Sequence, residues 1–362
     1  MHASTLFKKW RGRALAAATT LALAGGTLGL AAGPAAAAPS FGRAYVWANS
    51  PAAALGSPYV PAGAYSRNST GATNTVVRTG TGQYTVRMPN LGRIGGVVHV
   101  TAYGPGSHTC STVSWVPNGS RLDVRVACFT RTGVRANSMF TASFENTAAL
   151  GGTRYAYLWA NQPSAAGYVP ATAYQFNSAG ATNTITRSGT GSYLVRLPAI
   201  GSSAGHVQVT AYGDAAARCK VGSWTVSGTA QLVRVYCSNA FGRALDHRFS
   251  LTYTRATGLL RTTPAAYAWA DRPTNAGYNP AAAYSYNSSG VVNRIRRTGV
   301  GVYQFHPANM PLANGTVQVT AYGPDAAYCK VDFWTPGSGV QVRCFSALGA
   351  PKDTFYDVSF QR

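Results

Sequence analysis

The heptapeptide YVWANSP at residues 45–51 recurs as YLWANQP at 157–163 and as YAWADRP at 267–273. Three further phrases recur in the same order, namely N-S-x-G, R-x-G-x-G-x-Y and V-T-A-Y-G. The tyrosine of the last phrase stands at 103, 212 and 322, which gives periods of 109 and 110 residues. A period of this length is that of a whole domain rather than of a solenoid turn. We therefore expect three β repeats, over residues 39–146, 153–255 and 264–362.

Alternation of apolar and polar residues predicts the secondary structure of each repeat. Residues 84–88, 98–103 and 122–129 alternate in this way, and Gly, Pro, Asn and Ser clusters separate such runs. Runs with a period of two predict half-buried antiparallel strands. Several short strands per hundred residues favour an all-β fold of three tandem antiparallel β-sandwich-like domains, Ig-like or jelly-roll. A β-trefoil is disfavoured because its repeats would be less than half as long.

The six cysteines fall two to a repeat and predict three disulfides, Cys110–Cys128, Cys219–Cys237 and Cys329–Cys344. If each pair faces across a hairpin, the turn centres on Gly119, on Gly228 and between residues 336 and 337, which are all turn-forming positions. Each closed loop contributes roughly 3 kcal/mol of stability. The alternative, a metal site, is disfavoured because C-x-x-C spacing and histidine partners are missing. We expect no metal.

The N-terminus predicts export from the cell. Four basic residues between positions 8 and 13 precede an apolar run from 14 to 32, and AAAP follows at 36–39. A basic head, an apolar middle and an A-x-A exit predict a secretory signal peptide over residues 1–38. A retained membrane anchor is the alternative, disfavoured because Thr and Gly interrupt the run. No later run reaches the ~18 apolar residues that span a bilayer. We expect a secreted, extracellular monomer without a membrane span.

The charge of the chain is strongly positive. Without the predicted signal peptide it carries 27 basic against 9 acidic residues, a net charge of +18, and its only lysines are Lys220, Lys330 and Lys352. Two interpretations stay open. The charge serves solubility in an arginine-rich composition, or it attracts extracellular polyanions such as cell-wall polymers and acidic polysaccharides.

Three arginines are candidates for such binding because of their spacing from the second cysteine of each repeat. Arg125, Arg234 and Arg343 precede that cysteine by an odd number of residues. Successive side chains of a strand point to opposite faces, so these arginines lie on the face opposite the sulfur. If the disulfide faces the core, the arginines face solvent.

The residues typical of catalysis do not recur. No histidine occupies a shared position, and Glu145 is the only glutamate. Asp246 and Asp353 stand at a position that repeat 1 fills with Asn137. Paired-carboxylate hydrolysis and a Ser-His-Asp triad would need their groups in each copy of an active unit. No G-x-x-x-x-G-K phosphate loop is present, and R-x-G-x-G-x-Y is typical of a tight turn. We expect no enzymatic activity and no cofactor.

What the three repeats share is aromatic, amide and guanidinium side chains. The shared candidates for binding are Trp47, Trp159, Trp269, Asn68, Asn177, Asn287, Arg78, Arg187 and Arg297. Aromatic rings and amides suit a glycan-binding module. The structural alternative is that the tryptophans pack in the core and the asparagines form turns.

The repeated phrase Y-x-W-A-x-x-P…N-S-x-G…R-x-G-x-G-x-Y…V-T-A-Y-G…C…W…C resembles secreted tandem-repeat proteins of high-GC Gram-positive bacteria. The resemblance covers the whole mature chain, and because that group has no assigned activity, it implies no function.

Two functions from different classes remain. The first is a binding or adhesion protein that uses three weak sites for avidity on a cell envelope, glycan or polyanion. The second is a structural or protective matrix or coat protein without a small ligand. A secreted enzyme is the third and least favoured hypothesis.

Overall fold

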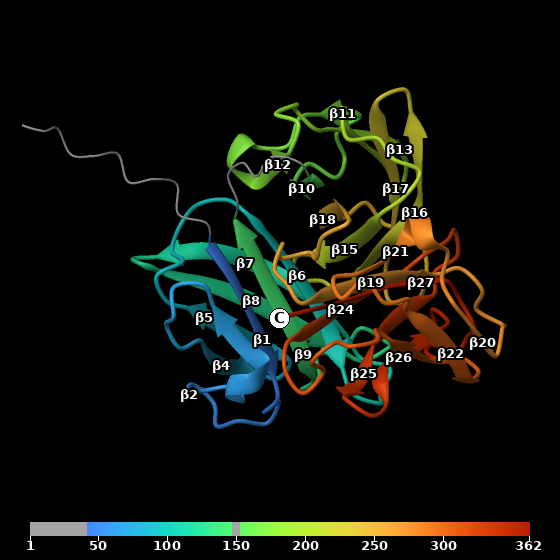
Figure 1. The fold of residues 1–362 in the computed structure, drawn as a ribbon. Coiled ribbons are helices and arrows are strands. Elements are labelled where there is room, and N and C mark those ends of the chain that lie inside the picture. Colours follow the sequence, from blue (N-terminus) through green and yellow to red (C-terminus); the bar gives the residue numbers. More distant parts are fainter. Residues whose placement is uncertain (1–41, 147–152) are drawn as a thin grey trace, which may run out of the picture. The chain divides into compact units, whose positions relative to one another are not determined.

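The computed structural model describes residues 42–146 and 153–362, and within these ranges it contains strands and short 3₁₀ turns but no α-helix (Figure 1). The predicted all-β class is therefore confirmed. The predicted signal peptide lies outside the described residues. Residues Pro39–Arg362 form one compact unit, so a division into three separately folding domains stays a prediction. We call residues 39–146, 153–255 and 264–362 repeats 1, 2 and 3, after the sequence.

The same succession of strands occurs three times. Repeat 1 contains β1 (Gly42–Ala48), β2 (Pro58–Tyr59), β3 (Ser66–Asn68), β4 (Thr75–Gly80), β5 (Gln83–Met88), β6 (Val97–Tyr103), β7 (Thr109–Asn118), β8 (Arg121–Phe129) and β9 (Met139–Asn146). Repeat 2 contains β10 (Arg154–Ala160), β11 (Gly167–Tyr168), β12 (Gln175–Asn177), β13 (Thr184–Gly189), β14 (Ser192–Leu197), β15 (His206–Tyr212), β16 (Arg218–Ser227), β17 (Ala230–Ser238) and β18 (Arg248–Arg255). Repeat 3 contains β19 (Ala265–Ala270), β20 (Gly277–Tyr278), β21 (Ser285–Asn287), β22 (Arg294–Gly299), β23 (Val302–His306), β24 (Thr316–Ala321), β25 (Tyr328–Thr335), β26 (Gly339–Phe345) and β27 (Tyr356–Gln361). The 3₁₀ turns are η1 (Gly63–Tyr65), η2 (Thr172–Tyr174) and η3 (Ala282–Tyr284).

Each repeat contributes two sheets that face each other. In repeat 1, β3-β1-β9-β6 form a four-stranded antiparallel part and β2-β4-β5-β8-β7 a five-stranded part. Val46, Val98 and Phe140 from the first part meet Val86 and Val124 from the second in one buried cluster. Apolar residues at every second position of both sheets make this core, which is the sandwich-like arrangement that the alternation predicts.

The three predicted disulfides are present, and each closes a hairpin. Cys110 lies directly opposite Cys128 in the β7–β8 pair, and the other two pairs have the same register. The turns that join these strands contain Gly119 and Gly228, both in the left-handed backbone region with φ of 61° and 58°. Glycine adopts this region without a steric penalty, so the predicted turn positions are confirmed.

The phrase R-x-G-x-G-x-Y forms the tight turn between β4 and β5 and its two counterparts. Its second glycine in repeat 1, Gly82, has φ of 63°, and a Cβ there would lie 2.5 Å from the Cys128 carbonyl oxygen. Only glycine fits this close approach, which explains the residue at that position.

Edge strands of different repeats pair in parallel and join the repeats in a closed cycle. Tyr212 of β15 bridges Thr112 of β7, Tyr322 bridges Val221 of β16, and Tyr103 of β6 bridges Val331 of β25. Backbone N–H groups of the next residue reinforce each bridge: Gly213 to Thr112 O at 2.8 Å, Gly323 to Val221 O at 2.9 Å, and Gly104 to Val331 O at 3.0 Å. The five-stranded part of each repeat therefore continues into the four-stranded part of the next, and repeat 3 continues into repeat 1.

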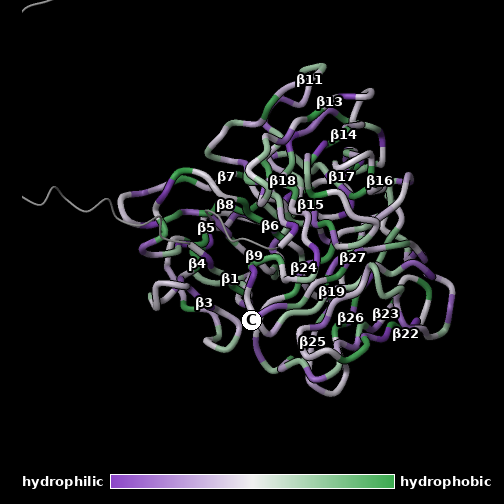
Figure 2. Tube along the Cα trace, turned by 45° about the horizontal axis from the view of Figure 1, so that its top comes forward, coloured by the Kyte–Doolittle hydropathy of each residue, from purple (hydrophilic) through white to green (hydrophobic). Residues whose placement is uncertain are grey.

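Strands β6, β9, β15, β18, β24 and β27 are buried on both faces, although their alternating sequences (Figure 2) predict half-buried strands. Figures 1 and 2 place these six strands side by side. Their polar faces meet between the repeats, where His99 bonds Thr210 and Thr252, and Thr101 bonds Gln318. The polar faces are covered by other repeats rather than by solvent, and we call this region the central polar core.

Glu145, at one end of β9, is a buried carboxyl group whose pKa is strongly raised. Neither of its carboxylate oxygens has a hydrogen-bond partner among the described residues, and the nearest ion pair, with Arg43, is 3.7 Å long. Burial raises the pKa of Glu145 to about 8, and the attraction of Arg43 and Arg261 only partly offsets this. Gln361 occupies the equivalent register in repeat 3.

We predict that Glu145→Gln stabilises the protein at pH 8. The raised pKa means that stability present below the unfolded pKa of about 4.5 is lost as pH rises toward 8, at up to ~1.4 kcal/mol per pH unit. The amide does not titrate, so the difference between variant and wild type should shrink toward pH 4. Urea unfolding at pH 4, 6 and 8 measures it. A variant that is less stable than wild type at pH 8 would show instead that an ionised Glu145 is stabilised by Arg43.

Candidate binding surfaces

The shared tryptophans lie at the boundaries between repeats. Trp47 of repeat 1 contacts Trp334 of repeat 3 with ring centroids 5.9 Å apart, and Tyr65 and Tyr103 complete the cluster. The same four-ring cluster recurs with Trp159 against Trp115 and with Trp269 against Trp224. The first indole of each cluster is half-buried and packs one repeat on the next. Their role in ligand binding stays a prediction.

The shared asparagines make hydrogen bonds within their own repeat. Asn68 Nδ2 donates to Asn74 Oδ1 at 3.0 Å and to the Pro89 carbonyl at 2.9 Å. Asn177 and Asn287 make the same pair of bonds in repeats 2 and 3. These bonds tie the short third strand of each repeat to the end of the fifth.

Two of these asparagines also line open surface pockets. Asn68 lies with Val60 and Arg67 around a pocket that encloses about 580 Å³. Asn287 lies with Tyr286 and Val292 around a pocket of about the same volume at equivalent positions of repeat 3. The recurrence of one hollow in two repeats fits the hypothesis of repeated weak sites, which the geometry leaves as a prediction.

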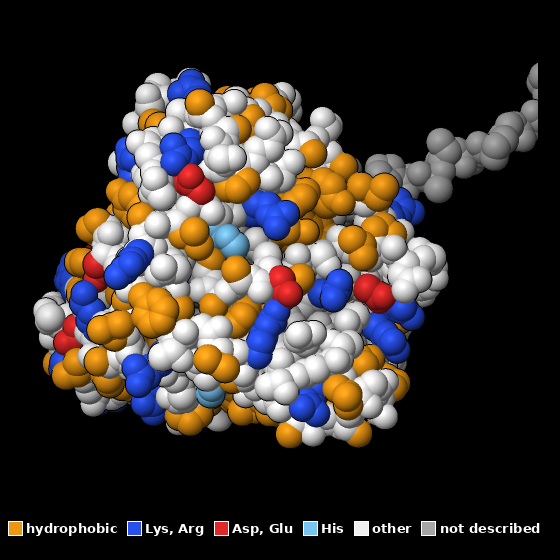
Figure 3. All heavy atoms as spheres, turned by 180° about the vertical axis from the view of Figure 1, so that it is seen from behind, with side chains coloured by type: hydrophobic (Ala, Val, Ile, Leu, Met, Phe, Trp, Pro, Cys, Tyr) orange, Lys and Arg blue, Asp and Glu red, His pale blue; other side chains and the backbone are white. Residues whose placement is uncertain are grey.

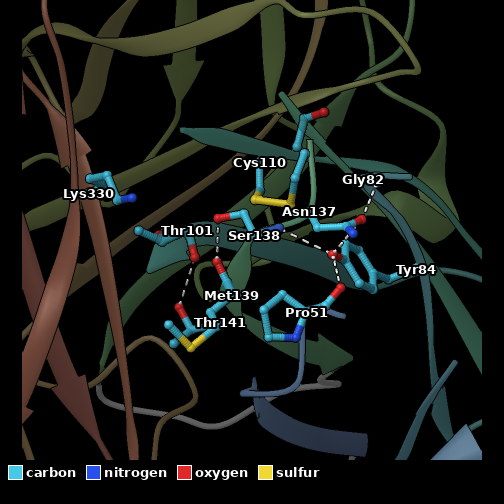
Figure 4. Close-up of a disulfide and its surroundings, with 12 residues drawn as sticks. Pro51, Gly82, Tyr84, Thr101, Cys110, Asn137, Ser138, Met139, Thr141 and Lys330 are labelled. Carbon is cyan, nitrogen blue, oxygen red and sulfur yellow. Dashed lines mark hydrogen bonds between the residues drawn. A yellow bond between two sulfur atoms is a disulfide. The ribbon is translucent and has the colours of Figure 1, made fainter. Parts of the chain in front are cut away.

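The arginines of the R-x-G-x-G-x-Y phrase bond Asp246, Asp353 and, in repeat 1, Asn137. In the sequence these three residues stand out only because they occupy equivalent positions. Arg297 donates to both oxygens of Asp353 at 2.9 and 2.8 Å, and Asp353 Oδ1 also accepts bonds from the Gly301 N–H and the Tyr303 hydroxyl. Arg187 and Asp246 repeat this arrangement. Asn137 takes the place of the carboxylate in repeat 1, as Figure 4 shows beside Gly82 and Tyr84. These arginines hold the turn between the fourth and fifth strands in place.

The three arginines near the second cysteines lie on β8, β17 and β26, opposite in direction to the sulfur atoms. Cys128, Cys237 and Cys344 are buried, whereas Arg125 is exposed and Arg234 half-buried. Arg343 differs from the other two. It stands opposite Lys330 rather than at the register of Arg125 and Arg234, and its Nε donates to Asp332 at 2.6 Å.

The acidic residues of the chain are all engaged with basic ones. Each of the nine carboxyl groups lies at salt-bridge distance from a basic side chain, in the pairs Arg43–Glu145, Arg121–Asp123, Arg135–Asp214, Arg187–Asp246, His206–Asp357, Arg272–Asp271, Arg297–Asp353 and Arg343–Asp332, and around Asp325 with Lys220 and Lys352. Most basic side chains therefore have no carboxylate to neutralise them. Figure 3 shows Lys and Arg side chains spread over one face, with few acidic groups among them.

Sequence reasoning missed the position of two lysines. Lys220 and Lys330 each follow the first cysteine of their repeat and are buried, at 6% and 2% exposure, under a loop of the next repeat. The rarity of lysine in the chain was the only signal in the sequence that could have pointed to them.

Comparison with protein-family models, with curated proteins and with solved structures finds no match for this chain. The described residues contain no group of His, Cys, Asp and Glu side chains placed to hold a metal ion. Among the same residues, no helix has the length and apolar character needed to cross a membrane.

We predict that Asp353→Asn is well tolerated and that Asp353→Ala is not. The amide keeps acceptors for the Gly301 N–H and the Tyr303 hydroxyl, as Asn137 does in repeat 1, and the lost ion pair is partly exposed, so the cost should stay below ~1 kcal/mol. Alanine leaves both donors without this partner and should cost roughly 1–3 kcal/mol. Chemical unfolding at pH 7 measures both values.

Acid provides a second readout for the same pair. Hydrogen bonds from Arg297 lower the pKa of Asp353, so the stability it contributes is present above the unfolded pKa of about 3.8 and is lost as pH falls through the lower folded pKa. The gap between wild type and Asp353→Asn should therefore close below pH 4. A gap independent of pH would contradict this assignment.

Proposed function

We propose that this chain is a secreted, non-enzymatic protein that binds extracellular polyanions, such as an anionic cell-wall polymer or an acidic polysaccharide. The observation that carries the proposal is the charge balance. All nine acidic side chains are engaged within the protein, so the surplus of basic side chains has no carboxylate partner. Three disulfides and the N-terminal signal pattern support the secreted location.

Each repeat presents arginines on the outer face of its five-stranded part. Arg125 of repeat 1, Arg196 of repeat 2, and Arg294 and Arg296 of repeat 3 are exposed on strands of these parts. An exposed guanidinium without a carboxylate partner binds an anionic polymer by charge and by release of its counterions. Contacts on several repeats add to one another on a single polymer, so weak contacts give useful total affinity.

The non-enzymatic part of the proposal rests on the buried titratable groups. In the central polar core, His99 bonds Thr210 and Thr252, and His206 bonds Asp357. Both histidines are buried. Burial lowers the pKa of both histidines to about 3, so they stay neutral and their ring nitrogens serve hydrogen bonds between repeats. These groups are structural polar residues rather than acids or bases open to a substrate.

The second candidate is a structural matrix or coat protein without a ligand. The closed cycle of repeats and one disulfide in each favour a durable extracellular particle equally well. Binding to a polyanion separates the two candidates, because a purely structural protein has no need of it.

We predict that the mature protein is retained on immobilised teichoic acid or heparin at about 50 mM NaCl and released near 200 mM. Replacing Arg125, Arg234 and Arg296 together with serine should weaken binding roughly tenfold and make its salt dependence shallower by roughly 2–3 counterions. Arg296 is chosen in repeat 3 because Arg343 already bonds Asp332.

The matched control carries lysine at the same three positions. It keeps the charge and should retain the polymer at low salt, while circular dichroism and thermal unfolding verify that both variants fold. Absence of retention at low salt, or equal retention by the serine variant, would exclude polyanion binding by these faces and favour the structural candidate.

A further inference from the structure

The three repeats enclose a pocket that no single repeat forms. It encloses about 610 Å³, part of it open to solvent, and equivalent residues of each repeat line it, including Thr101, Thr210 and Thr320 and the three first cysteines. We call it the central pocket. It lies where the closed cycle brings β6, β15 and β24 together with the loops that follow them.

Lys330 lines this pocket as a buried cation without a carboxylate at hydrogen-bond distance. Its side chain is 2% exposed, and its Nζ donates to the Gly106 carbonyl of repeat 1 at 2.7 Å. Asp332, two residues along the chain, accepts bonds from Arg343 and Gln341 instead. An ammonium group has three N–H donors, and the Gly106 carbonyl is the one acceptor found for them among the described residues.

At the equivalent boundary between repeats 2 and 3, Lys220 has a carboxylate partner that Lys330 lacks. Lys220 Nζ donates to the Asp325 carbonyl at 2.9 Å and also to the Asp325 carboxylate at 2.8 Å. Gly106 stands where repeat 3 has Asp325, in the aligned stretches VTAYGPG and VTAYGPD. The buried lysine therefore has a carboxylate partner at the boundary between repeats 2 and 3, and only a carbonyl partner at the boundary between repeats 3 and 1.

A second cation lines the same pocket. Arg218 is 9% exposed, its guanidinium donates to the carbonyls of Ala347 and Arg131, and its Nε has no hydrogen-bond partner among the described residues. It stacks on Tyr328 at 4.0 Å from the ring centre, and Tyr328 also lines the pocket. The lining of the pocket therefore carries positive charge from both Lys330 and Arg218.

His108, on the loop that carries Gly106, also lines the pocket and has its pKa lowered by burial and by the charge of Lys330. Figure 4 shows the amine end of Lys330 turned toward the side where Thr101 and Cys110 lie. Buried cations are stable in proteins when an anion or several hydrogen bonds neutralise them.

We propose that the central pocket binds a small oxyanion, whose oxygens accept hydrogen bonds from Lys330 Nζ, in a lining that also carries the charge of Arg218. Phosphate, sulfate and carboxylate share this chemistry, because each offers several acceptor oxygens to charged donors. The pocket is enclosed by three repeats, so it takes a free small ion rather than a segment of the polymers that the outer arginines would bind. This site is independent of the proposed function.

The test measures thermal unfolding of the whole mature protein with sodium sulfate, sodium phosphate or sodium acetate, at ionic strength held constant with NaCl and at pH 6.5. A ligand that binds the folded state alone raises the melting temperature in proportion to the logarithm of its concentration once that exceeds the Kd. Sulfate and phosphate without acetate would identify a tetrahedral anion, and acetate alone a carboxylate.

Two variants decide whether the effect arises in the pocket. Gly106→Asp supplies Lys330 with the carboxylate that Lys220 has, and a side chain fits there because the nearest atoms, at 3.1 and 3.4 Å, belong to the movable His108 ring. It should abolish the logarithmic shift, and so should Lys330→Met. Arg125→Ser removes an exposed charge and should leave the shift unchanged.

The pH dependence gives a readout that folding defects do not imitate. Burial lowers the pKa of Lys330 to about 7, with Asp332 raising it and Arg343 lowering it further. Binding needs the protonated amine, so the affinity for sulfate, which does not titrate here, should fall up to tenfold per pH unit above 7. His108 faces the same ammonium, and burial keeps it neutral over that range.

Three outcomes would overturn the proposal. They are no logarithmic shift with any of the three anions, a shift in Gly106→Asp and Lys330→Met equal to that of the wild type, or an affinity independent of pH between 6 and 9. General salting-out by sulfate acts on every variant alike, so it cancels when a variant is compared with the wild type. Retention on heparin should not change in these two variants, so failure here and failure of the polyanion proposal are distinguishable.

Discussion

The structure depends on the burial of polar strand faces between the three repeats. One face of β6, β15 and β24 is apolar and packs inside its own sandwich, whereas the other carries Thr, His and Gln side chains. Several of these side chains find hydrogen-bond partners in other repeats, as His99 does in Thr210 and Thr252. Buried polar groups are costly unless they are hydrogen-bonded, so the repeats are held in one relative register. The parallel bridges and the four-ring clusters act at the same boundaries.

A closed cycle of similar boundaries allows each boundary to differ in chemistry. At one equivalent position, Ser111 bonds the Gly213 carbonyl, Lys220 bonds Asp325, and Lys330 bonds the Gly106 carbonyl. The backbone is the same in all three, so the charge at each boundary is set by one or two side chains. This is how a scaffold of near-identical repeats comes to hold a buried lysine, Lys330, without the carboxylate partner that Lys220 has.

Local features of the fold could be predicted from the sequence, and contacts between repeats could not. Cys110 and Cys128 share one hairpin, so their register and the turn at Gly119 follow from spacing. Alternation along β6 reads the same whether its polar face meets water or another repeat, so the central polar core was not foreseen. Arg297 and Asp353 stand 56 residues apart, and their shared positions gave no sign that they bond. Trp47 belongs to the first repeat and Trp334 to the third, and only the closed cycle brings them together.

The disulfides stabilise more than their own hairpins, because the strands that they join also contact the next repeat. Cys110, Cys219 and Cys329 lie on the edge strands β7, β16 and β25, and the residue two positions later in each strand forms the parallel bridge to the next repeat. The residue between them is Ser111, Lys220 or Lys330, which bonds the neighbouring loop. The disulfide fixes the register of an edge strand, so it also positions the parallel bridge, the side-chain bond to the neighbouring loop and the lining of the central pocket. One three-residue segment in each repeat contains the cysteine, the residue that bonds the neighbouring loop and the residue of the bridge. The sandwich core and the contacts between repeats are therefore coupled through the same strands.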